Sequence, residues 1–406
     1  MQLGYYIAKK LSLSKQHSFT KTISALAVAA VSISVCVVLL AFGILLGFKQ
    51  EIRQKVKGYA GDISVTRYQL ASGNESNLFE IDPTFIQSAR NTDHIVSVFP
   101  FLHKAGIIKS DSTLEGVVLK GYGHDYDFSF YKKHLKKGHL PVYTDSVDSY
   151  DILLSQHTAN LLNVDTGDRL FLYFIDNKDV RQRRPTVVGI FDTGLQEFDK
   201  QFAIADIRSL QRLVNMEYNV AGGYEIRLDD FEHVEAAQNN LAKLLDYNYA
   251  INSIVELYPT IFQWLELVDT NVLVIIILML VVAIINIITV LLILIIDRIP
   301  MIGILKSMGA SSQKVTSIFN WQGLIILIGG LLVGNGIALL LAYLQVNHNL
   351  IGLDPSTYYM DAVPFHLPLS YWLLINVGAL AVCFIFTYIP VRLIHTIQPA
   401  QSIRFR

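Results

Sequence analysis

Four long apolar stretches, one near the start and three in the last third of the chain, constrain this sequence more than any other feature. We place them at residues 23–48, 272–296, 318–344 and 371–394. Each exceeds the ~20 residues that a helix needs to cross a bilayer, and the first three contain no Asp, Glu, Lys or Arg. The sequence therefore predicts four transmembrane helices, with a large polar block at residues 49–271 between the first and the second.

The distribution of basic residues predicts the orientation. The segments that we expect in the cytoplasm, residues 1–22, 297–317 and 395–406 with the end of the fourth stretch, carry Lys9, Lys10, Lys15, Lys21, Arg298, Lys306, Lys314, Arg392, Arg404 and Arg406. The link at residues 345–370 has Asp354 and Asp361 but no lysine or arginine, as the positive-inside rule expects outside. The block at 49–271 is then external too. A cleaved signal peptide is the alternative for the first stretch, which is however longer than the roughly 7–15 apolar residues of such a peptide.

The sequence of the external block predicts an α+β domain of two lobes, with the second lobe inserted between about residues 121 and 202. Alternating apolar and polar residues predict strands at 62–67, 94–102, 105–109, 114–121, 152–155, 169–174, 185–191, 202–205, 223–228 and 250–257. Helices are expected at 83–89, 156–162, 206–214 and 231–245. Both cysteines, Cys36 and Cys383, lie in membrane stretches, so this domain must fold without disulfides.

The two ends of the block look helical instead of resembling flexible linkers. Residues 48–57 and 260–271 would extend the first two membrane helices outward as stalks. An apolar face at helical spacing on the second stalk needs a partner, for which the first stalk, another subunit or a lipid chain would serve. The alternative is that both segments are helix ends fraying into solvent. Our candidates for the stalk or a lipid cavity are Phe42, Leu46, Phe48, Ile261, Phe262, Trp264, Leu265, Val268 and Val272.

A short amphipathic helix is expected between the second and third stretches. Pro300 suits its first turn and Gly309 its end. Met301, Ile304, Leu305 and Met308 fall on one face. Such a helix either rests on lipid at the inner membrane surface or docks into a cytosolic protein.

At residues 303–310 the run GILKSMGA resembles the coupling-helix signature of type VII ABC transporter permeases, the FtsX/MacB-like superfamily. Five further segments resemble its lipoprotein-releasing branch: YIAKK at 6–10, LGFKQE at 46–51, LKG at 119–121, VGIFDTGLQEFD at 188–199, and YIPVR at 388–392 followed by QPA at 398–400. The resemblance covers the whole chain. It implies a multi-pass, non-catalytic permease of a Gram-negative inner membrane, with a MacB-like, porter-like periplasmic domain.

The resemblance also implies partners. A cytosolic ATP-binding subunit would contact Pro300, Met301, Ile304, Leu305, Lys306, Met308 and Gly309. The other expected partners are a second permease, identical or paralogous, a lipoprotein substrate, membrane lipid and a periplasmic lipoprotein chaperone.

Two features depart from the family pattern. Pro300 and Met301 stand where relatives usually carry Arg-Glu, so an apolar contact would replace a charged one. The hairpin at residues 174–185, at the position where relatives recruit the chaperone, is short and basic. Its Arg181, Arg183 and Arg184 would either meet an acidic partner or form a solvated charge run.

Several chemistries lack their sequence signatures. The chain has no GxxxxGK[ST] phosphate loop, so ATP and Mg²⁺ are expected in the partner subunit and no cofactor here. The histidines show no zinc-ligand spacing and no serine sits in GxSxG, so we expect neither a metal site nor a hydrolase. A net charge of −1 gives no reason to expect nucleic acid.

Small and polar residues within the membrane stretches predict helix packing. The pairs Gly43 and Gly47, and Gly330 and Gly334, have the spacing that allows close helix approach. Asn286 and Asn335 are expected to form hydrogen bonds across helix pairs.

The expected function is extraction of lipoproteins from the outer leaflet of the inner membrane toward a periplasmic carrier, driven by ATP hydrolysis in a separate subunit. One alternative is mechanotransmission to a periplasmic partner such as a cell-wall hydrolase, and another is efflux. An apolar cavity between the first two spans would favour transport, whereas a sealed, tightly packed interface would favour signalling.

Overall fold

The computed structural model describes residues 18–68, 77–110, 113–176, 179–213 and 219–395. The basic residues Lys9, Lys10, Lys15, Arg404 and Arg406, and the segments 6–10 and 398–400, lie outside this part. The chain divides into two units. The helical unit comprises residues 1–50, 264–352 and 362–406, and the sheet unit comprises residues 51–263 and 353–361.

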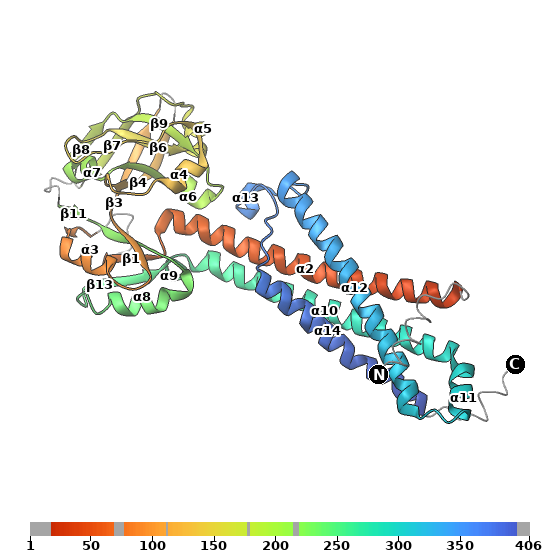
Figure 1. The fold of residues 1–406 in the computed structure, drawn as a ribbon. Helices are drawn as coiled ribbons and strands as arrows, with labels where there is room; N and C mark the ends of the chain where they lie inside the picture. Colours follow the sequence, from red (N-terminus) through yellow and green to blue (C-terminus); the bar gives the residue numbers. More distant parts are fainter. Residues whose placement is uncertain (1–17, 69–76, 111–112, 177–178, 214–218, 396–406) are drawn as a thin grey trace. The chain divides into compact units, whose positions relative to one another are not determined.

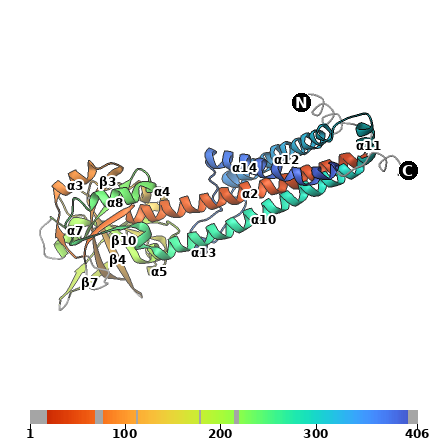
Figure 2. The same ribbon diagram turned by 90° about the horizontal axis from the view of Figure 1, so that it is seen from below.

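Four long helices make up the helical unit (Figure 1). They are α2 (Ser18–Ala60), α10 (Pro259–Asp297), α12 (Ser312–His348) and α14 (Leu369–Val391), and all four are long and apolar enough to cross a membrane. The short helix α11 (Ile299–Ser307) joins α10 to α12, and a 3-10 turn η2 (Arg392–His395) follows α14. Figure 2 shows the helices lying side by side, with a common core that includes Leu39, Ile287, Leu327 and Ile375.

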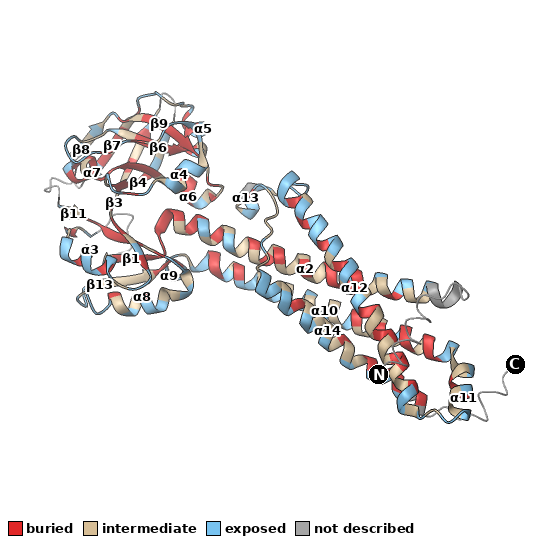
Figure 3. Ribbon diagram, in the orientation of Figure 1, coloured by how far each residue is buried: buried red, intermediate tan, exposed pale blue. Residues whose placement is uncertain are grey.

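Much of the apolar surface of these helices is left uncovered by the chain. Figure 3 shows exposed and half-exposed residues along α10, α12 and α14. In the most apolar 18-residue window of α10, only 11% is buried. Exposed leucine, isoleucine and valine in such numbers are stable only in lipid or against another protein.

The expected stalks are helical. Residues 48–57 lie within α2 and residues 260–271 within α10, so both helices continue well beyond the apolar runs. Ile261, Phe262 and Leu265 are buried, and Trp264 and Val268 are half-buried. The apolar face is therefore covered, as its spacing requires.

A mixed sheet is the centre of the sheet unit. Its main path runs β13 (Tyr249–Ser253), β1 (Ile63–Arg67), β12 (Gly223–Leu228), β3 (Ile95–Lys109), β4 (Leu114–Tyr122), β10 (Phe202–Asp206), β6 (Asp151–Ser155), β9 (Thr186–Phe191) and β5 (Leu135–Gly138). A hairpin of β7 (Phe171–Asp176) and β8 (Asp179–Arg183) pairs with the far end of β3. β2 (Phe79–Glu80) and β11 (Val220–Ala221) form a separate pair.

The sheet unit also contains short helices, and two groups of buried side chains form its cores. The helices are α3 (Pro83–Arg90), α4 (Ser129–His134), α5 (Gln156–Leu162), α6 (Gln196–Gln201), α7 (Ile207–Leu213), η1 (Phe231–His233), α8 (Val234–Leu241), α9 (Ile254–Leu257) and α13 (Pro355–Tyr358). One core includes Ile63, Phe85, Tyr224 and Leu241. The other includes Ile108, Leu154, Phe174 and Leu210.

The strand predictions are mostly confirmed, with two corrections. Residues 94–102 and 105–109 form one strand, β3, because His103 and Lys104 continue the pairing with β4. The strand expected at 250–257 ends at Ser253, where the Ser253 side chain and Glu256 form a capping box that starts α9. Helices α4, α6 and α13 and strands β2, β5 and β11 were not predicted, whereas β8 is the second arm of the hairpin expected at 174–185. The helix expected at 231–245 is the 3-10 turn η1 followed by α8, which ends at Leu241.

Candidate functional sites

The short helix predicted at 300–308 is present as α11, with limits shifted by one residue. Pro300 occupies the first turn of α11, and Met308 follows its last residue. Gly309 has a φ of +89°, a left-handed conformation that glycine adopts without a steric penalty. The chain can therefore turn sharply between α11 and α12.

Part of the apolar face of α11 is packed against other helices of the helical unit. Met301 and Leu305 pack with the buried Ile302 against residues of α10, α12 and α14, including Ile295, Phe319 and Val391. Lys306 Nζ donates a 2.6 Å hydrogen bond to the carbonyl oxygen of Ile394. Ile304 and Met308 stay exposed, at 53% and 80%. The four residues predicted to share a face span about 100° of the helix, so one edge packs inward and the other remains open.

The helical unit contains a partly open apolar cavity of about 270 Å³. Side chains from all four long helices line it, among them Phe42, Met279, Leu331 and Val382. Its few polar neighbours include Ser34 and Cys383. Of the residues expected at a lipid cavity, Phe42 lines this one, whereas Leu46, Phe48 and Val272 are half-buried residues that do not line it.

The small residues pack in two different ways. A Cβ atom on Gly330 would lie 2.5 Å from Val31, and one on Gly334 would lie 2.7 Å from the Ser32 carbonyl oxygen, so α12 approaches α2 closely there. A Cβ atom on Gly43 or Gly47 would instead meet Phe365 or Pro364, in the segment before α14. Gly330 and Gly334 thus allow one helix to pack against another, as predicted, whereas Gly43 and Gly47 allow α2 to pack against a loop.

Polar contacts also link the long helices. Asn335 Nδ2 on α12 donates a 2.6 Å hydrogen bond to Asn376 Oδ1 on α14. Lys49 on α2 forms an ion pair with Asp269 on α10, where both helices have left their apolar runs. Asn335 meets the expectation from the sequence, whereas the ion pair was not predicted.

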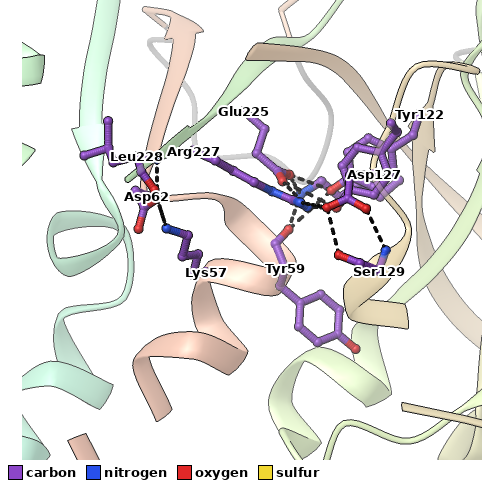
Figure 4. Close-up of polar contacts among 11 residues, drawn as sticks. Lys57, Tyr59, Asp62, Tyr122, Asp127, Ser129, Glu225, Arg227 and Leu228 are labelled. Carbon is purple, nitrogen blue, oxygen red and sulfur yellow. Dashed lines mark hydrogen bonds and ion pairs between the residues drawn. The ribbon is translucent and has the colours of Figure 1, made fainter. Parts of the chain in front are cut away.

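Within the sheet unit, the C-terminal end of α2 enters a largely buried polar network that we call the α2 junction. It is formed by Lys57, Tyr59, Asp62, Lys120, Tyr122, Tyr126, Asp127, Asp199, Glu225 and Arg227. Figure 4 shows the part of this network around Glu225, Arg227 and Asp62. Lys120 Nζ on β4 donates hydrogen bonds to the Tyr59 carbonyl oxygen and, at 2.9 Å, to Glu225 Oε2 on β12. A cation at this place also complements the partial negative charge of a helix C-terminus.

Glu225 is fully buried and has several further partners. Tyr122 donates a 2.6 Å hydrogen bond to Glu225 Oε2, and the Arg227 guanidinium lies 3.5 Å from Glu225 Oε1. Burial is the main cause that lowers the pKa of Lys120, and the charge of Glu225 opposes this shift. Because buried charges need hydrogen-bonding partners, these contacts fix the position of the α2 end on the sheet.

A second group of contacts holds the Tyr59 side chain. Its hydroxyl donates a 2.5 Å hydrogen bond to Asp199 Oδ1, and the Thr193 hydroxyl donates to the same oxygen at 2.8 Å. Burial raises the pKa of Asp199, and the hydrogen bonds from Tyr59 and Thr193 act in the opposite direction. Gly61, the residue after the end of α2, has a φ of +71°, so the chain turns there.

A third group of contacts holds Asp62, the residue that follows Gly61. Its carboxylate lies 2.7 Å from Lys57 Nζ and accepts a 2.7 Å hydrogen bond from the Leu228 amide. Lys120 and Asp199 belong to two of the sequence segments that carry the family resemblance, 119–121 and 188–199. Their convergence on one helix end was not predicted, because residues so far apart in sequence give no local signal of contact.

The arginines of the β7–β8 hairpin make contacts within the sheet unit. Arg181 donates a hydrogen bond to the Leu213 carbonyl oxygen, and Arg184 lies 4.6 Å from the Phe171 ring centroid. Arg183 donates to the Gln182 carbonyl oxygen. Only part of this basic surface is therefore available to a partner.

Comparison with known proteins agrees with this architecture. The family model for the MacB-like periplasmic core domain matches residues 24–244, and that for the C-terminal part of FtsX-like permeases matches residues 273–399. "Lipoprotein-releasing system transmembrane protein LolC" of Xylella fastidiosa is 22% identical over 97% of both chains. "Lipoprotein-releasing system transmembrane protein LolE" of Haemophilus influenzae is 21% identical over 99% of both.

A solved structure is also similar in part. The periplasmic region of MacB from Actinobacillus actinomycetemcomitans covers 51% of this chain and 95% of its own length, with 16% identity and a TM-score of 0.36.

The two matched regions define an ABC transporter permease with a mixed α/β domain between its apolar helices. Because the periplasmic core match covers more than half of the 406 residues, the chain belongs to the FtsX/MacB-like permease family, with relatives named LolC and LolE over nearly its full length.

Proposed function

We propose that this chain is the permease subunit of an ABC transporter that extracts lipoproteins from the outer leaflet of the inner membrane toward a periplasmic carrier. The observation that carries the proposal is the match, over nearly the whole chain, to relatives named for lipoprotein release. The large domain would face the periplasm as two lobes, one around each hydrophobic core, with both termini in the cytoplasm.

The apolar cavity supports transport over signalling. A hydrocarbon chain leaves the bilayer at a cost of about 0.8 kcal/mol per methylene group, so an acylated protein needs an apolar path and an energy source. The cavity lined by Phe42, Met279 and Leu331 offers such surroundings. The largely uncovered α10 is the surface that we assign to the second permease subunit.

The exposed residues of α11 support docking of an ATP-binding subunit, which would bind ATP and Mg²⁺. Ile304 and Met308 form a small apolar patch beside Gly309, and a buried contact with another protein would cover it. The α2 junction would then carry motion from α2 into the sheet unit, because its buried ion pairs resist separation of the helix end from the sheet.

The same junction is the observation that favours mechanotransmission as a second candidate. A firmly held helix end would serve a signalling permease equally well. The two candidates differ in cargo, since only a transporter releases lipoprotein from the membrane in an ATP-dependent manner.

The test uses the full chain coexpressed with its ATP-binding subunit and reconstituted with a triacylated lipoprotein. We expect ATP-dependent release into a soluble carrier fraction from the unaltered complex. Ile304→Asp with Met308→Asp should abolish both release and copurification of the ATP-binding subunit. Gln313→Asp adds a negative charge at an exposed position at the start of α12 and should retain both.

Copurification of the ATP-binding subunit without lipoprotein release by the unaltered complex would overturn the transport proposal in favour of signalling. If the Ile304→Asp, Met308→Asp variant still copurified normally with the ATP-binding subunit, the assignment of α11 as the docking site would be overturned. The transport proposal itself would not be affected.

A further inference from the structure

Three residues that can ligate a metal ion meet at one edge of the sheet unit. His94 precedes β3, Asp229 follows β12, and His233 ends η1. His94 Nδ1 lies 3.1 Å from Asp229 Oδ2, and His233 Nδ1 lies 3.5 Å from Asp229 Oδ1. One ligand atom from each of the three residues lies within 4.8 Å of the others. The zinc-ligand spacing sought in the sequence could not show this group, because His94 is distant from the other two along the chain.

The main chain holds the three residues in place. Pairing of β12 with β3 sets Leu228 opposite Ile95, and the Asp229 amide donates a 3.1 Å hydrogen bond to the His94 carbonyl oxygen. His94 itself has a φ of +69°, a left-handed conformation that is uncommon outside glycine. Asp229 and His233 are four residues apart, so the first turn after β12 places them on the same side.

Acidic residues flank the three residues along the chain, while Lys57 and Arg53 approach the same turn at the Leu228 carbonyl oxygen and the Phe231 ring. Asp93, Asp230, Glu232 and Glu235 are close neighbours of the three residues along the chain. Among the described residues, no lysine or arginine forms an ion pair with Asp229. His233 Nδ1 is shielded from solvent and, apart from its 3.5 Å approach to Asp229 Oδ1, has no polar partner. A shielded nitrogen of this kind is an available ligand atom.

The distances suit a small divalent ion. With zinc-to-ligand bonds of about 2.0–2.2 Å in a tetrahedron, neighbouring ligand atoms lie roughly 3.3 Å apart. His94 Nδ1 lies 3.1 Å from Asp229 Oδ2 and His233 Nδ1 lies 3.5 Å from Asp229 Oδ1, so both separations are near that value, and an ion held by one of the two oxygens requires a shift of the other imidazole. The imidazole rings are stacked with centroids 3.6 Å apart, so both must turn for their nitrogens to face one ion. Side-chain exposures of 38% for His94 and 42% for His233 leave room for this rotation.

We propose that His94, Asp229 and His233 bind one first-row divalent transition-metal ion, such as Zn²⁺, which ties the start of β3 to the turn between β12 and α8. A fourth coordination position remains for water. The bound ion would stabilise this edge of the sheet unit, since it links two segments that are distant in sequence.

The test is titration of the metal-free, tag-free full chain in detergent with Zn²⁺ by calorimetry, and with Co²⁺ by visible absorption. His94→Gln and His233→Gln remove one ligand each. His124→Gln is the matched control, because His124 Nδ1 also pairs with an aspartate, Asp145, at 2.8 Å but is not part of this three-residue group. Thermal unfolding without metal verifies that each variant is folded.

We expect the unaltered chain and His124→Gln to share a Zn²⁺ site that His94→Gln and His233→Gln weaken by at least the ~10–100-fold typical of changes around a metal site. Co²⁺ should give absorption bands of a low-coordinate site only when all three ligands are present, and Zn²⁺ should raise the unfolding temperature only then. Equal Zn²⁺ affinity and stoichiometry in all four proteins would overturn the proposal. So would an unaltered chain that binds no Zn²⁺.

Discussion

The ammonium group of Lys120 donates a hydrogen bond to the main-chain carbonyl oxygen of Tyr59, the second-to-last residue of helix α2. Lys120 lies on the central strand β4, so this contact joins a helix that begins in the helical unit to the middle of the sheet. The Glu225 carboxylate, 2.9 Å from Lys120 Nζ, keeps the lysine paired in an interior position. The positions of the α2 end, of Lys120 and of Glu225 therefore depend on one another.

Replacing Lys120 by methionine should destabilise the sheet unit by about 3–5 kcal/mol, because the buried Glu225 loses its main cation. Denaturant unfolding of the purified full chain in detergent measures this change. The double variant Lys120→Met, Glu225→Gln should recover a large part of the loss, since no uncompensated charge remains. A double variant no more stable than Lys120→Met would contradict the role given to the ion pair.

The hydroxyl of Tyr59 gives a second prediction with an internal control. Tyr59→Phe removes the hydrogen bond to the buried Asp199 and should cost about 1–3 kcal/mol of unfolding free energy. Tyr131, whose ring centroid lies 6.0 Å from that of Tyr59, is also buried, but its hydroxyl has no partner. Tyr131→Phe should therefore be neutral or slightly stabilising in the same unfolding measurement. Equal losses in the two variants would show that ring packing, not the Asp199 contact, matters.

The sequence predicts those features that rest on local patterns. The long helices follow from uncharged apolar runs, and α11 follows from Pro300, Gly309 and the spacing of the residues between them. Strand β3 shows where local patterns fail, because His103 and Lys104 look like a break between two strands. Both side chains are instead accommodated within a continuous strand that has sheet neighbours on each side.

The α2 junction and the pair His94 and His233 could not be predicted from local sequence patterns, for a related reason. Tyr59, Lys120, Asp199 and Glu225 come from four separate segments that only the sheet brings together. The resemblance to known permeases drew attention to Lys120 and Asp199 but not to the residues that they contact. His94 and His233 likewise become neighbours only when β3 pairs with β12.

His103 makes the stability of the sheet unit depend on pH. Burial, aided by the charge of Lys120, lowers the pKa of His103 from 6.5 to about 3. Between these values the unfolded chain binds a proton that the folded chain does not, so stability falls as the pH is lowered from 6.5. His103→Phe keeps an aromatic ring near Phe101 and Phe202 and should lose less stability between about pH 7.5 and about pH 5 than the unaltered chain.

Thermal unfolding midpoints at the two pH values measure this effect. His139→Gln changes an exposed histidine of the same unit and should keep the pH dependence of the unaltered chain. The idea fails if His103→Phe and His139→Gln have the same pH dependence.

The glycines of α12 allow a test of helix packing with a matched control two residues away. A methyl group on Gly334 would lie 2.7 Å from the carbonyl oxygen and 3.1 Å from the Cα atom of Ser32, both main-chain atoms of α2 that cannot move aside cheaply. Gly334→Ala should therefore destabilise the helical unit by about 1–3 kcal/mol. Gly336 has no atom within 4 Å of such a methyl group, so Gly336→Ala should be neutral or stabilising by up to about 1 kcal/mol. Unfolding in increasing fractions of a denaturing detergent measures both variants, and equal behaviour of the two would mean that α2 and α12 do not approach each other at Ser32.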